Sequence, residues 1–481
     1  PGADFDLYAA AALIGSTPVA AGGLIGGLLD THLVQEPTRG RYRFHDLVRA
    51  YATAQGTEPD RAEALTRLLD HYCHTASTAM DLTHPYERER RLPARPAGTP
   101  SPPLDDETAA ETWLDAELGN LLAAAQLAAD HGWPNHLRHL SAAMHRHLRT
   151  LRRYADAEDL HERALTAARA RADRRGEAEA LIGVGHMDRL QGRSEGATER
   201  YQLALAVARS CGHRPIELDA LIYLGHMDRY RCRYGPARAR FEEALEIAPI
   251  TGDRAAEMEA LIGLGWVRLE SEHDVGDEFE RGLDLARALG HRIGEGTALQ
   301  AVGYAHRLHG RHDRAVGAFE QALELSRAIR SPWTELSALV DLARLHRLMG
   351  HAEEAAACCR AVLDLTWETS SPVHEAHAWY GLGRLHHAAG RMDEALVHHE
   401  QALELAIELG LPVVQAQARD GLAHVHIALG RHDLAREQWE DALGCLAGIA
   451  VGHTQDDDVT AESVRGRLER LAGTGPPARS E

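Results

Sequence analysis

Arginine, histidine and aromatic residues recur at two positions of a sequence pattern that returns about every 40 residues. Arginine guanidinium groups bind carboxylates and phosphates through paired hydrogen bonds, and aromatic rings give a partner apolar anchors. Such a row of side chains favours recognition of an acidic ligand. The first position holds Arg146, His186, His226, Trp266, Tyr304, Arg344, Arg384 and His424, and the second holds Arg149, Arg189, Arg229, Leu269, Arg307, Arg347, His387 and Ile427.

The elements that must position this row are helices of an internal repeat. The stretch E-A-L-I-G-V-G-H-M-D-R from Glu179 returns from Asp219 as D-A-L-I-Y-L-G-H-M-D-R. Positions 3, 7 and 10 of each copy share one face of the first helix, so the row lies along one stripe. Each repeat buries its apolar face against its neighbours, so a long chain can form one array. Later copies begin at Glu259, Thr297, Ser337, His377 and Gln417, and a degenerate copy begins at His139.

The copy from Thr297 resembles the tetratricopeptide signature, in which small residues let two antiparallel helices approach and large residues fill the gap. The resemblance covers residues 139 to about 452. It implies an all-α, right-handed tetratricopeptide-repeat solenoid of about eight 40-residue helix pairs, whose concave groove carries the arginine-rich stripe. We place the residues beyond the usual 34 at the end of the second helix and in the loop after it, for example Glu324–Glu335. The matching residues are Ala301–Gly303, His306, Gly310, His312, Ala315, Phe319 and Ala322.

A further column, nine residues into each copy, contains four histidines. Equivalent atoms of adjacent repeats lie too far apart to share one ion at bond lengths of roughly 2 Å. In tetratricopeptide repeats this position packs between helices, so we interpret the column as structural and predict no metal site. Its members are Asp188, Asp228, Arg268, His306, His346, His386 and His426.

Composition narrows the function further. The formal net charge of −20 argues against a general nucleic-acid or anionic-membrane binder. The chain has no lysine, which excludes Schiff-base chemistry and the lysine of a P-loop. Six cysteines show no C-x-x-C pairing, and no signal peptide or long apolar run is present, so a cytoplasmic location is expected. We find no motif of catalysis and predict that this chain is not an enzyme and holds no cofactor.

The N-terminal stretch predicts helices at 5–15 and 18–30, two strands around the turn Pro37–Gly40, and a helix from Leu47. The segment Asp30–Ala52 resembles the winged helix that closes the NB-ARC module of STAND-type signalling ATPases. It is most similar to actinobacterial regulators of the AfsR type, in which tetratricopeptide repeats follow.

The triplet Phe44-His45-Asp46 matches the Met-His-Asp motif of that family, with Phe in the Met place. The resemblance implies that His45 would reach the β-phosphate of ADP and hold the closed state, while Asp46 supports the local geometry. The alternative is that His45 caps or packs the helix start. No G-x-x-x-x-G-K-[ST] is present, so ADP or ATP is expected only in a longer parent protein. That ATPase would also be the route to oligomerisation.

A DNA-binding winged helix is another interpretation of the same segment, because Arg39, Arg41, Arg43 and Arg49 lie on the wing and the following helix. The version of this domain in the resembled family is a regulatory spacer, so direct DNA binding is not expected.

The predicted organisation has four parts. Residues 1–57 form the winged-helix segment, and 58–134 form a helical linker and cap with helices at 59–83 and about 106–130 around the Pro-rich loop 93–103. Residues 135–452 are the repeats. Residues 453–481 are a C-terminal cap and tail, with one helix at 459–472.

Two functions follow from this organisation. The first is a sensing module that binds a protein, a peptide or a small acidic effector in the groove and controls an ADP-locked ATPase, with transcriptional control of secondary metabolism as output. The second is a free-standing scaffold without nucleotide linkage. A solvated face with charges paired at neighbouring turns is the plainer reading of the stripe. The predicted partner-binding residues are Arg146, Arg149, His186, Arg189, His226, Arg229, Trp266, Tyr304, Arg307, Arg344, Arg347, Arg384, His387 and His424.

Overall fold

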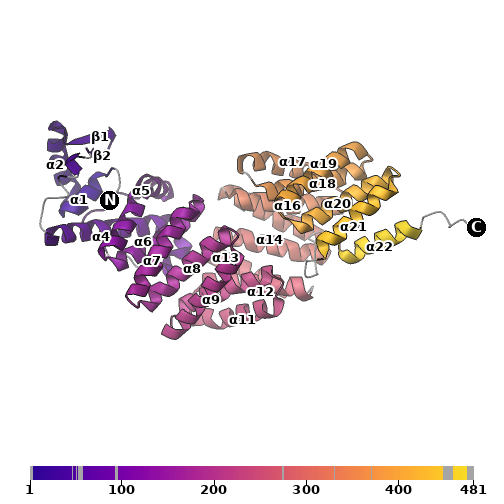
Figure 1. The fold of residues 1–481 in the computed structure, drawn as a ribbon, viewed down its shortest axis with the longest axis horizontal. Helices are drawn as coiled ribbons and strands as arrows, with labels where there is room; N and C mark the ends of the chain where they lie inside the picture. The colour runs from indigo at the N-terminus through magenta and orange to yellow at the C-terminus, as the bar shows by residue number, and fades with distance from the viewer. Residues whose placement is uncertain are drawn as a thin grey trace, which may run out of the picture. The chain divides into compact units, whose positions relative to one another are not determined.

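The computed structural model describes residues 4–45, 47–49, 51, 58–92, 96–272, 276–329, 331–369, 371–447 and 459–473. Helices form nearly all of it, and Figure 1 shows them following one another along the chain. The chain divides into two compact units. The first is Pro1–Asp228 with Ala239–Ala256, and the second is Arg229–Arg238 with Glu257–Glu481.

The chain starts with two short helices whose first turns are capped by side chains. Asp6 accepts a hydrogen bond from a backbone amide of α1 (Leu7–Ile14) at 2.7 Å. Thr17 does the same for α2 (Pro18–Asp30), whose first residue is proline. These caps satisfy amides that have no partner within the helix. Helix α2 begins at the predicted residue, and α1 begins two residues after its predicted start.

A β-hairpin follows the two helices. Strand β1 (Val34–Thr38) pairs antiparallel with β2 (Arg41–Phe44), and Gly40 in the turn has a φ of 79°, which favours glycine. Phe5 adds an isolated bridge to Tyr42. The order helix, helix, strand, strand is the one expected from the sequence.

A helical linker joins this module to the repeats. It contains α4 (Glu58–Thr83), the 3₁₀ helix η1 (Pro85–Arg90) and α5 (Glu107–His131). The two long helices agree with the predicted ones, whereas η1 was not predicted. Within the Pro-rich stretch, residues 96–103 contain neither helix nor strand.

An ion pair ties the hairpin to the linker. Arg41 of β2 contacts the carboxylates of Asp4 and Glu117, and Glu117 on α5 is only 1% exposed. Asn120 donates a hydrogen bond to the other oxygen of Glu117 at 2.6 Å. Tyr72 of α4 is buried beside this carboxylate. The hairpin is therefore fixed to α5 through a buried charge.

The repeats form a tetratricopeptide solenoid, and the described residues contain eight helix pairs, which confirms the predicted fold. Helix α22 (Ala461–Gly473) comes after them. The pairs are α6 (Pro134–Thr150) with α7 (Tyr154–Ala170), α8 (Arg174–Leu190) with α9 (Ser194–Cys211), α10 (Arg214–Tyr230) with α11 (Tyr234–Thr251), α12 (Arg254–Glu272) with α13 (Glu278–Leu289), α14 (Arg292–Leu308) with α15 (His312–Ala328), α16 (Pro332–Met349) with α17 (Ala352–Thr369), α18 (Pro372–Ala388) with α19 (Met392–Glu408), and α20 (Pro412–Ala428) with α21 (His432–Leu446).

The additional residues of each repeat are mostly helical. Helix α15 continues to Ala328, and α16 begins at Pro332. The added residues at Glu324–Glu335 therefore lengthen the end of the second helix, as predicted, and they form the start of the next first helix as well as the short connection between the two.

In five of the helix pairs, a ring of the second helix packs against a glycine of the first helix. A Cβ atom added at Gly265 would lie 2.6 Å from the ring of Phe279, and one added at Gly303 would lie 2.7 Å from that of Phe319. Only glycine permits this approach, and the rings then fill the space between helices. The column of buried residues that recurs at this place is His161, Tyr201, Phe241, Phe279, Phe319, Cys359, His399 and Trp439.

A second set of backbone positions, after seven of the first helices in the described ranges, takes a positive φ. Glycine occupies most of them, as left-handed backbone favours. Two are exceptions, Arg152 with a φ of 56° and Cys232 with a φ of 55°. The glycines are Gly192, Gly310, Gly350, Gly390 and Gly430.

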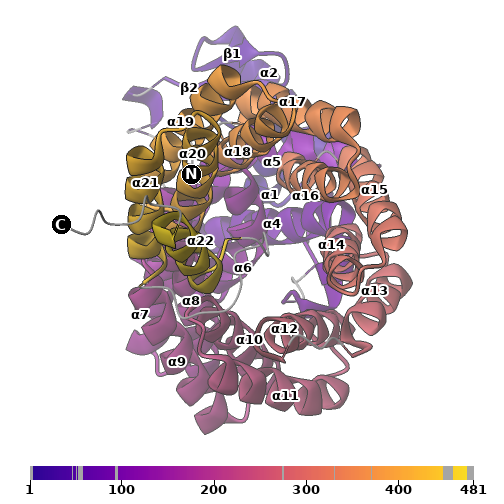
Figure 2. The ribbon, with the colours of Figure 1, turned by 90° about the vertical axis from the view of Figure 1, so that its right-hand side faces the viewer.

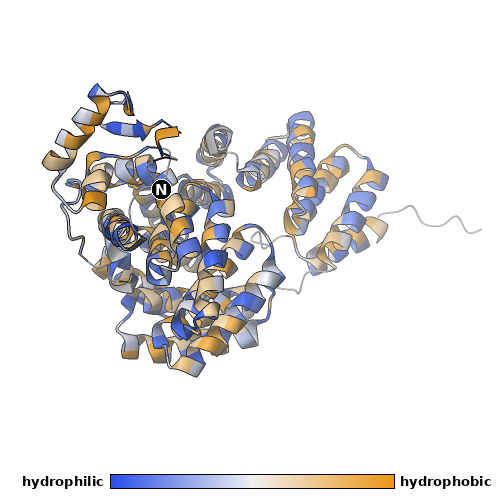
Figure 3. Ribbon diagram, turned by 60° about the vertical axis from the view of Figure 1, so that its left-hand side comes forward, coloured by the Kyte–Doolittle hydropathy of each residue, from blue (hydrophilic) through white to orange (hydrophobic). Residues whose placement is uncertain are grey.

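The first helices of the second unit face its inner side. Figure 2 shows α14, α16 and α18 along the inner edge of an arc, with α13, α15 and α17 along the outer edge. In Figure 3 hydrophobic and hydrophilic residues alternate along the repeat helices, as expected for amphipathic helices. The predicted stripe is thus carried by the inner helices of this unit.

None of the helices in the described ranges is by itself long and apolar enough to cross a membrane. Helices α1 and α2 reach that composition only when taken together, and they are bent by 101° relative to each other.

Candidate functional site

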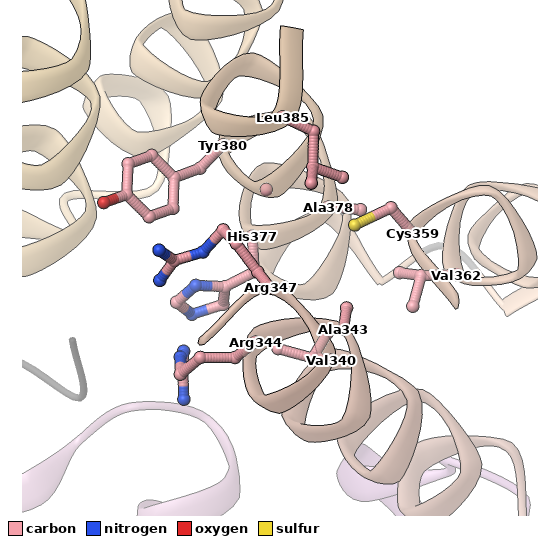
Figure 4. Close-up of a pocket in the computed structure, with 11 residues that line it drawn as sticks. Val340, Ala343, Arg344, Arg347, Cys359, Val362, His377, Ala378, Tyr380 and Leu385 are labelled. Atoms are coloured by element: carbon pink, nitrogen blue, oxygen red, sulfur yellow. The ribbon is translucent and has the colours of Figure 1, made fainter. Parts of the chain in front are cut away.

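Arginine and tyrosine side chains gather on α14, α16 and α18 in the second unit. Figure 4 shows Arg344, Arg347, His377 and Tyr380 directed to one side of α16 and α18, where they line a small recess. Cys359 of α17 lies on the opposite side. The predicted arginines of neighbouring repeats therefore converge on one face.

Aromatic rings hold these arginines in place. The guanidinium of Arg307 lies 4.6 Å from the ring centroid of Tyr304, and the Tyr304 ring lies 5.4 Å from that of Trp266. Arg384 donates a hydrogen bond to the hydroxyl of Tyr380 at 3.0 Å. Stacking and hydrogen bonding to tyrosine restrict the guanidinium groups without neutralising their charge.

Two arginines, Arg344 and Arg347, line the recess. Asp341 lies among the arginines, with 3.4 Å between its carboxylate and Arg344 Nη1. Burial raises the pKa of Asp341, while Arg344 and Arg307 act in the opposite direction. Arg307 and Arg344 are themselves buried, at 6% and 8% exposed. We call Arg307, Arg344, Arg347 and Arg384, together with Tyr304 and Tyr380, the inner arginine cluster.

Other predicted groove residues of the second unit are engaged by carboxylates. Arg229 donates to Glu270 at 2.5 Å, and its guanidinium lies 5.7 Å from the ring of Trp266. His424 lies 3.5 Å from buried Asp420, and its ring centroid lies 6.1 Å from that of His387. At these places carboxylates outside the row therefore pair with it.

In the first unit the row begins next to the linker. Arg146 donates to Glu87 of η1, with 2.8 Å between Nε and Oε1. Arg149 and Arg189 are half-buried, and so is His226, whose ring centroid lies 5.1 Å from that of Phe241. Glu87 was not predicted to meet the row, because η1 itself was not expected.

His186 belongs to a buried network of imidazoles. His161 Nδ1 lies 2.7 Å from the Ser141 hydroxyl, His161 Nε2 lies 3.0 Å from His145 Nδ1, and His145 Nε2 lies 3.0 Å from His186 Nδ1. Burial lowers the pKa of His161 to about 4 and lowers those of His145 and His186 well below 6.5. We call Ser141, His161, His145 and His186 the histidine chain.

The column nine residues into each repeat makes packing and ion-pair contacts. Asp188 pairs with Arg193 at 2.7 Å, and Asp228 pairs with Arg240. His386 packs edge-on against His398, with 4.9 Å between ring centroids. These contacts fit the structural interpretation. Across the described part of the chain, no three His, Cys, Asp or Glu side chains are arranged to hold a metal ion.

The predicted nucleotide-sensing residues lie at the end of the hairpin. His45 is exposed, and its carbonyl accepts a hydrogen bond from the Arg49 amide at 2.9 Å. Asp46 lies outside the described residues. Of the arginines that a DNA-binding wing would use, Arg41 is occupied by its ion pairs with Asp4 and Glu117. This occupancy weakens the DNA-binding alternative.

Comparison with known proteins supports the assignment of tetratricopeptide repeats. A family model described as the MalT-like TPR region matches residues 280–479, and a tetratricopeptide repeat model matches residues 178–250. The regulatory protein AfsR of Streptomyces griseus is 42% identical over 140 residues, and that of Streptomyces coelicolor is 38% identical over 136 residues. These matches cover 28% and 27% of this chain and 14% of each relative.

Two solved structures share the fold. A signal transduction ATPase with numerous domains (STAND) that has a tetratricopeptide repeat sensor, from Pyrococcus horikoshii, is similar over 97% of this chain and 63% of its own, with 13% identity and a TM-score of 0.62. The apo quorum sensor NprR from B. thuringiensis is similar over 70% of this chain and 96% of its own, with 14% identity and a TM-score of 0.52.

Proposed function

We propose that this chain is the sensing module of a regulatory protein and that its repeats bind an acidic segment of a peptide or protein. The inner arginine cluster carries this proposal, because four guanidinium groups and two tyrosine rings line the inner side of one unit. Arginine forks pair with carboxylates in two parallel hydrogen bonds, and the rings anchor the apolar parts of a peptide. A small acidic effector is the alternative ligand of the same cluster.

The charge of the chain supports an acidic ligand. The protein has a formal net charge of −20, so its average field repels anions. Arginines gathered on the inner side of one unit would oppose that field locally. Recognition would then depend on the recess rather than on the general surface.

A regulatory role is supported by the relatives. The matched segments of AfsR and the sensor repeats of the STAND ATPase point to a module that reports ligand binding to a nucleotide-dependent switch. In the full-length parent, His45 and Asp46 would act on bound ADP, and the output would be transcriptional control. A ligand can shift such a switch only if it binds the two states with different affinity. A cytoplasmic location belongs to this proposal.

The ligand proposal is tested with two labelled peptides of equal length, one rich in glutamate and one rich in lysine. Arg347→Gln combined with Arg384→Gln should weaken binding of the acidic peptide about tenfold or more, because hydrogen bonds to charged groups contribute roughly 1.5–3 kcal/mol each. Circular dichroism checks that the variant is folded. Binding should also weaken as salt rises.

The matched control exchanges two exposed arginines of the outer helices, Arg360→Gln with Arg436→Gln. It has the same change of net charge and should bind as the parent protein does. Equal binding by the inner and outer variants, or equal binding of the two peptides, would refute the proposal.

A free-standing scaffold is the competing function. In a full-length protein that contains a P-loop, His45→Ala should reduce the amount of ADP that copurifies and raise basal activity. Unaltered ADP content would favour the scaffold.

A further inference from the structure

The carboxylate of Glu87 contacts Arg146 in the way that the carboxylate of an acidic ligand would. Glu87 is part of η1, and its carboxylate takes the first arginine of the row, with side-chain exposures of 23% for Glu87 and 18% for Arg146. The charge of Arg146 lowers the pKa of Glu87 although burial acts against it. The linker thus places a carboxylate on the same stripe of side chains that is proposed to bind acidic ligands.

The next arginines of the row have no such carboxylate. Arg149 lies one turn further along α6, and Arg189 holds the equivalent position on α8. Within the described ranges, neither guanidinium forms an ion pair with an Asp or Glu side chain. Burial lowers the pKa of Arg149, and the charges of Arg146 and Arg189 lower it further. The hydrogen bond between His145 and His186 joins α6 and α8 one turn before Arg149 and Arg189, so these two arginines lie on adjacent helices near the Arg146–Glu87 pair.

Aromatic rings pack beside these half-buried arginines. Tyr201 and Tyr223 stack with 5.3 Å between ring centroids, and Tyr223 packs edge-on against His186 at 4.2 Å. An oxyanion held by two arginines is bound more strongly where burial reduces screening. A group with two negative charges would compensate the repulsion between Arg149 and Arg189 and would also attract Arg146.

We propose that Arg149 and Arg189 form an oxyanion site for a phosphate or carboxylate group of a ligand, and that the bound ligand displaces Glu87 from Arg146 and releases η1 from the first repeat. The inference rests on the proposed sensing role, but the residues are separate from the inner arginine cluster. It gives the sensing role a switch, because η1 directly follows α4. Helix α4 contacts the N-terminal module, where Arg67 donates to the Leu13 carbonyl at 2.9 Å.

The test uses the full chain with two probes, inorganic pyrophosphate and citrate, and measures affinity by calorimetry and hydrogen exchange of residues 84–92. Either probe should speed exchange in this segment. Tighter binding of pyrophosphate would identify a phosphate ligand, and tighter binding of citrate a carboxylate ligand. Binding of neither probe would overturn the proposal.

Two variants distinguish competition between Glu87 and the probe from a general change in electrostatic attraction of the probe. Glu87→Gln removes the internal competitor and should tighten probe binding roughly three- to tenfold. Glu111→Gln has the same charge change at an exposed position of α5 and should change affinity much less. Equal effects of the two variants would contradict displacement of Glu87.

Arg149→Gln with Arg189→Gln should abolish both probe binding and the exchange response. Retained binding would place the site elsewhere. Arg347→Gln with Arg384→Gln should leave the probe response intact, even where it weakens peptide binding. This pair of variants therefore distinguishes failure of the oxyanion site from failure of the proposed peptide recognition.

Discussion

His145 Nε2 lies 3.0 Å from His186 Nδ1, so two imidazoles from neighbouring repeats share one hydrogen bond inside the protein. His161 continues the chain on the other side of His145. A neutral imidazole has one donor and one acceptor nitrogen, and both nitrogens of the middle ring, His145, face another imidazole. A second proton on His145 would therefore place two N–H groups face to face.

The histidine chain should make stability depend on pH. Burial lowers the folded-state pKa of His161 to about 4, whereas the ordinary value is 6.5. Between these pH values the unfolded state binds more protons, so the free energy of unfolding falls as pH falls below 6.5. Each histidine kept neutral contributes a slope of up to about 1.4 kcal/mol per pH unit. Urea unfolding at pH 7.5 and pH 5.5 measures it.

His161→Phe is the variant that tests the origin of this slope. Phenylalanine occupies the equivalent place at Phe241, Phe279 and Phe319, so the ring packing against glycine is retained. The variant should lose less stability between pH 7.5 and pH 5.5 than the parent protein. An unchanged slope would show that other histidines dominate.

Glycine under the packed rings should be irreplaceable. Gly265→Ala places a methyl group 2.6 Å from the Phe279 ring, which forces the ring or the helix to move. We expect a loss of about 1–3 kcal/mol in the free energy of unfolding. Gly317→Ala is the control, because no atom lies within 4 Å of the added methyl group. It should be neutral or stabilise the helix by up to ~1 kcal/mol.

The Arg41–Glu117 pair should hold the hairpin to the linker. Glu117→Gln keeps the shape but leaves Arg41 without its buried counter-charge, so faster hydrogen exchange is expected in β1 and β2. The cost should be about 1–3 kcal/mol in local stability. Glu63→Gln, in an exposed pair with Arg67, should cost less than about 1 kcal/mol. Unchanged exchange in the hairpin of Glu117→Gln would mean that apolar contacts fix it.

A left-handed residue offers a route to higher stability. Arg152 is exposed and has a φ of 56°, where most other repeats have glycine. Arg152→Gly should raise the melting temperature, corresponding to a gain of about 0.5–1 kcal/mol after the larger entropy of unfolded glycine is included. Arg152→Ala retains the Cβ atom and should bring no gain. Equal melting temperatures for the two variants would contradict this explanation.

The repeats could be predicted because the pattern that defines them lies within short stretches of the sequence. Each copy contains its own Ala, Leu and Gly at fixed spacing, so the helix pairs and the side of the stripe could be read from the sequence. The partners of that stripe could not. Glu87 meets Arg146 across 59 residues, and Glu117 meets Arg41 across 76.

Such distant pairs depend on how separate segments fold together. His145 was missed for a related reason. It lies outside the three positions that define the stripe, and its partner His161 comes from a second helix. His161 occupies the same repeat position as Phe241 and Phe319. This recurrence of a ring is the one feature of the sequence that could have predicted a contact between His161 and the preceding helix.

The rings that pack on glycine differ along the array in one respect. The first and seventh pairs use imidazoles, His161 and His399, whereas Phe241, Phe279 and Phe319 in the middle are hydrocarbon. Burial lowers the pKa of His399 to about 3. Because a repeat array is stabilised unit by unit, mild acid should loosen the first and seventh pairs before α10 to α15. The order in which the helix pairs unfold in acid therefore depends on whether the ring packed against glycine is an imidazole or a hydrocarbon.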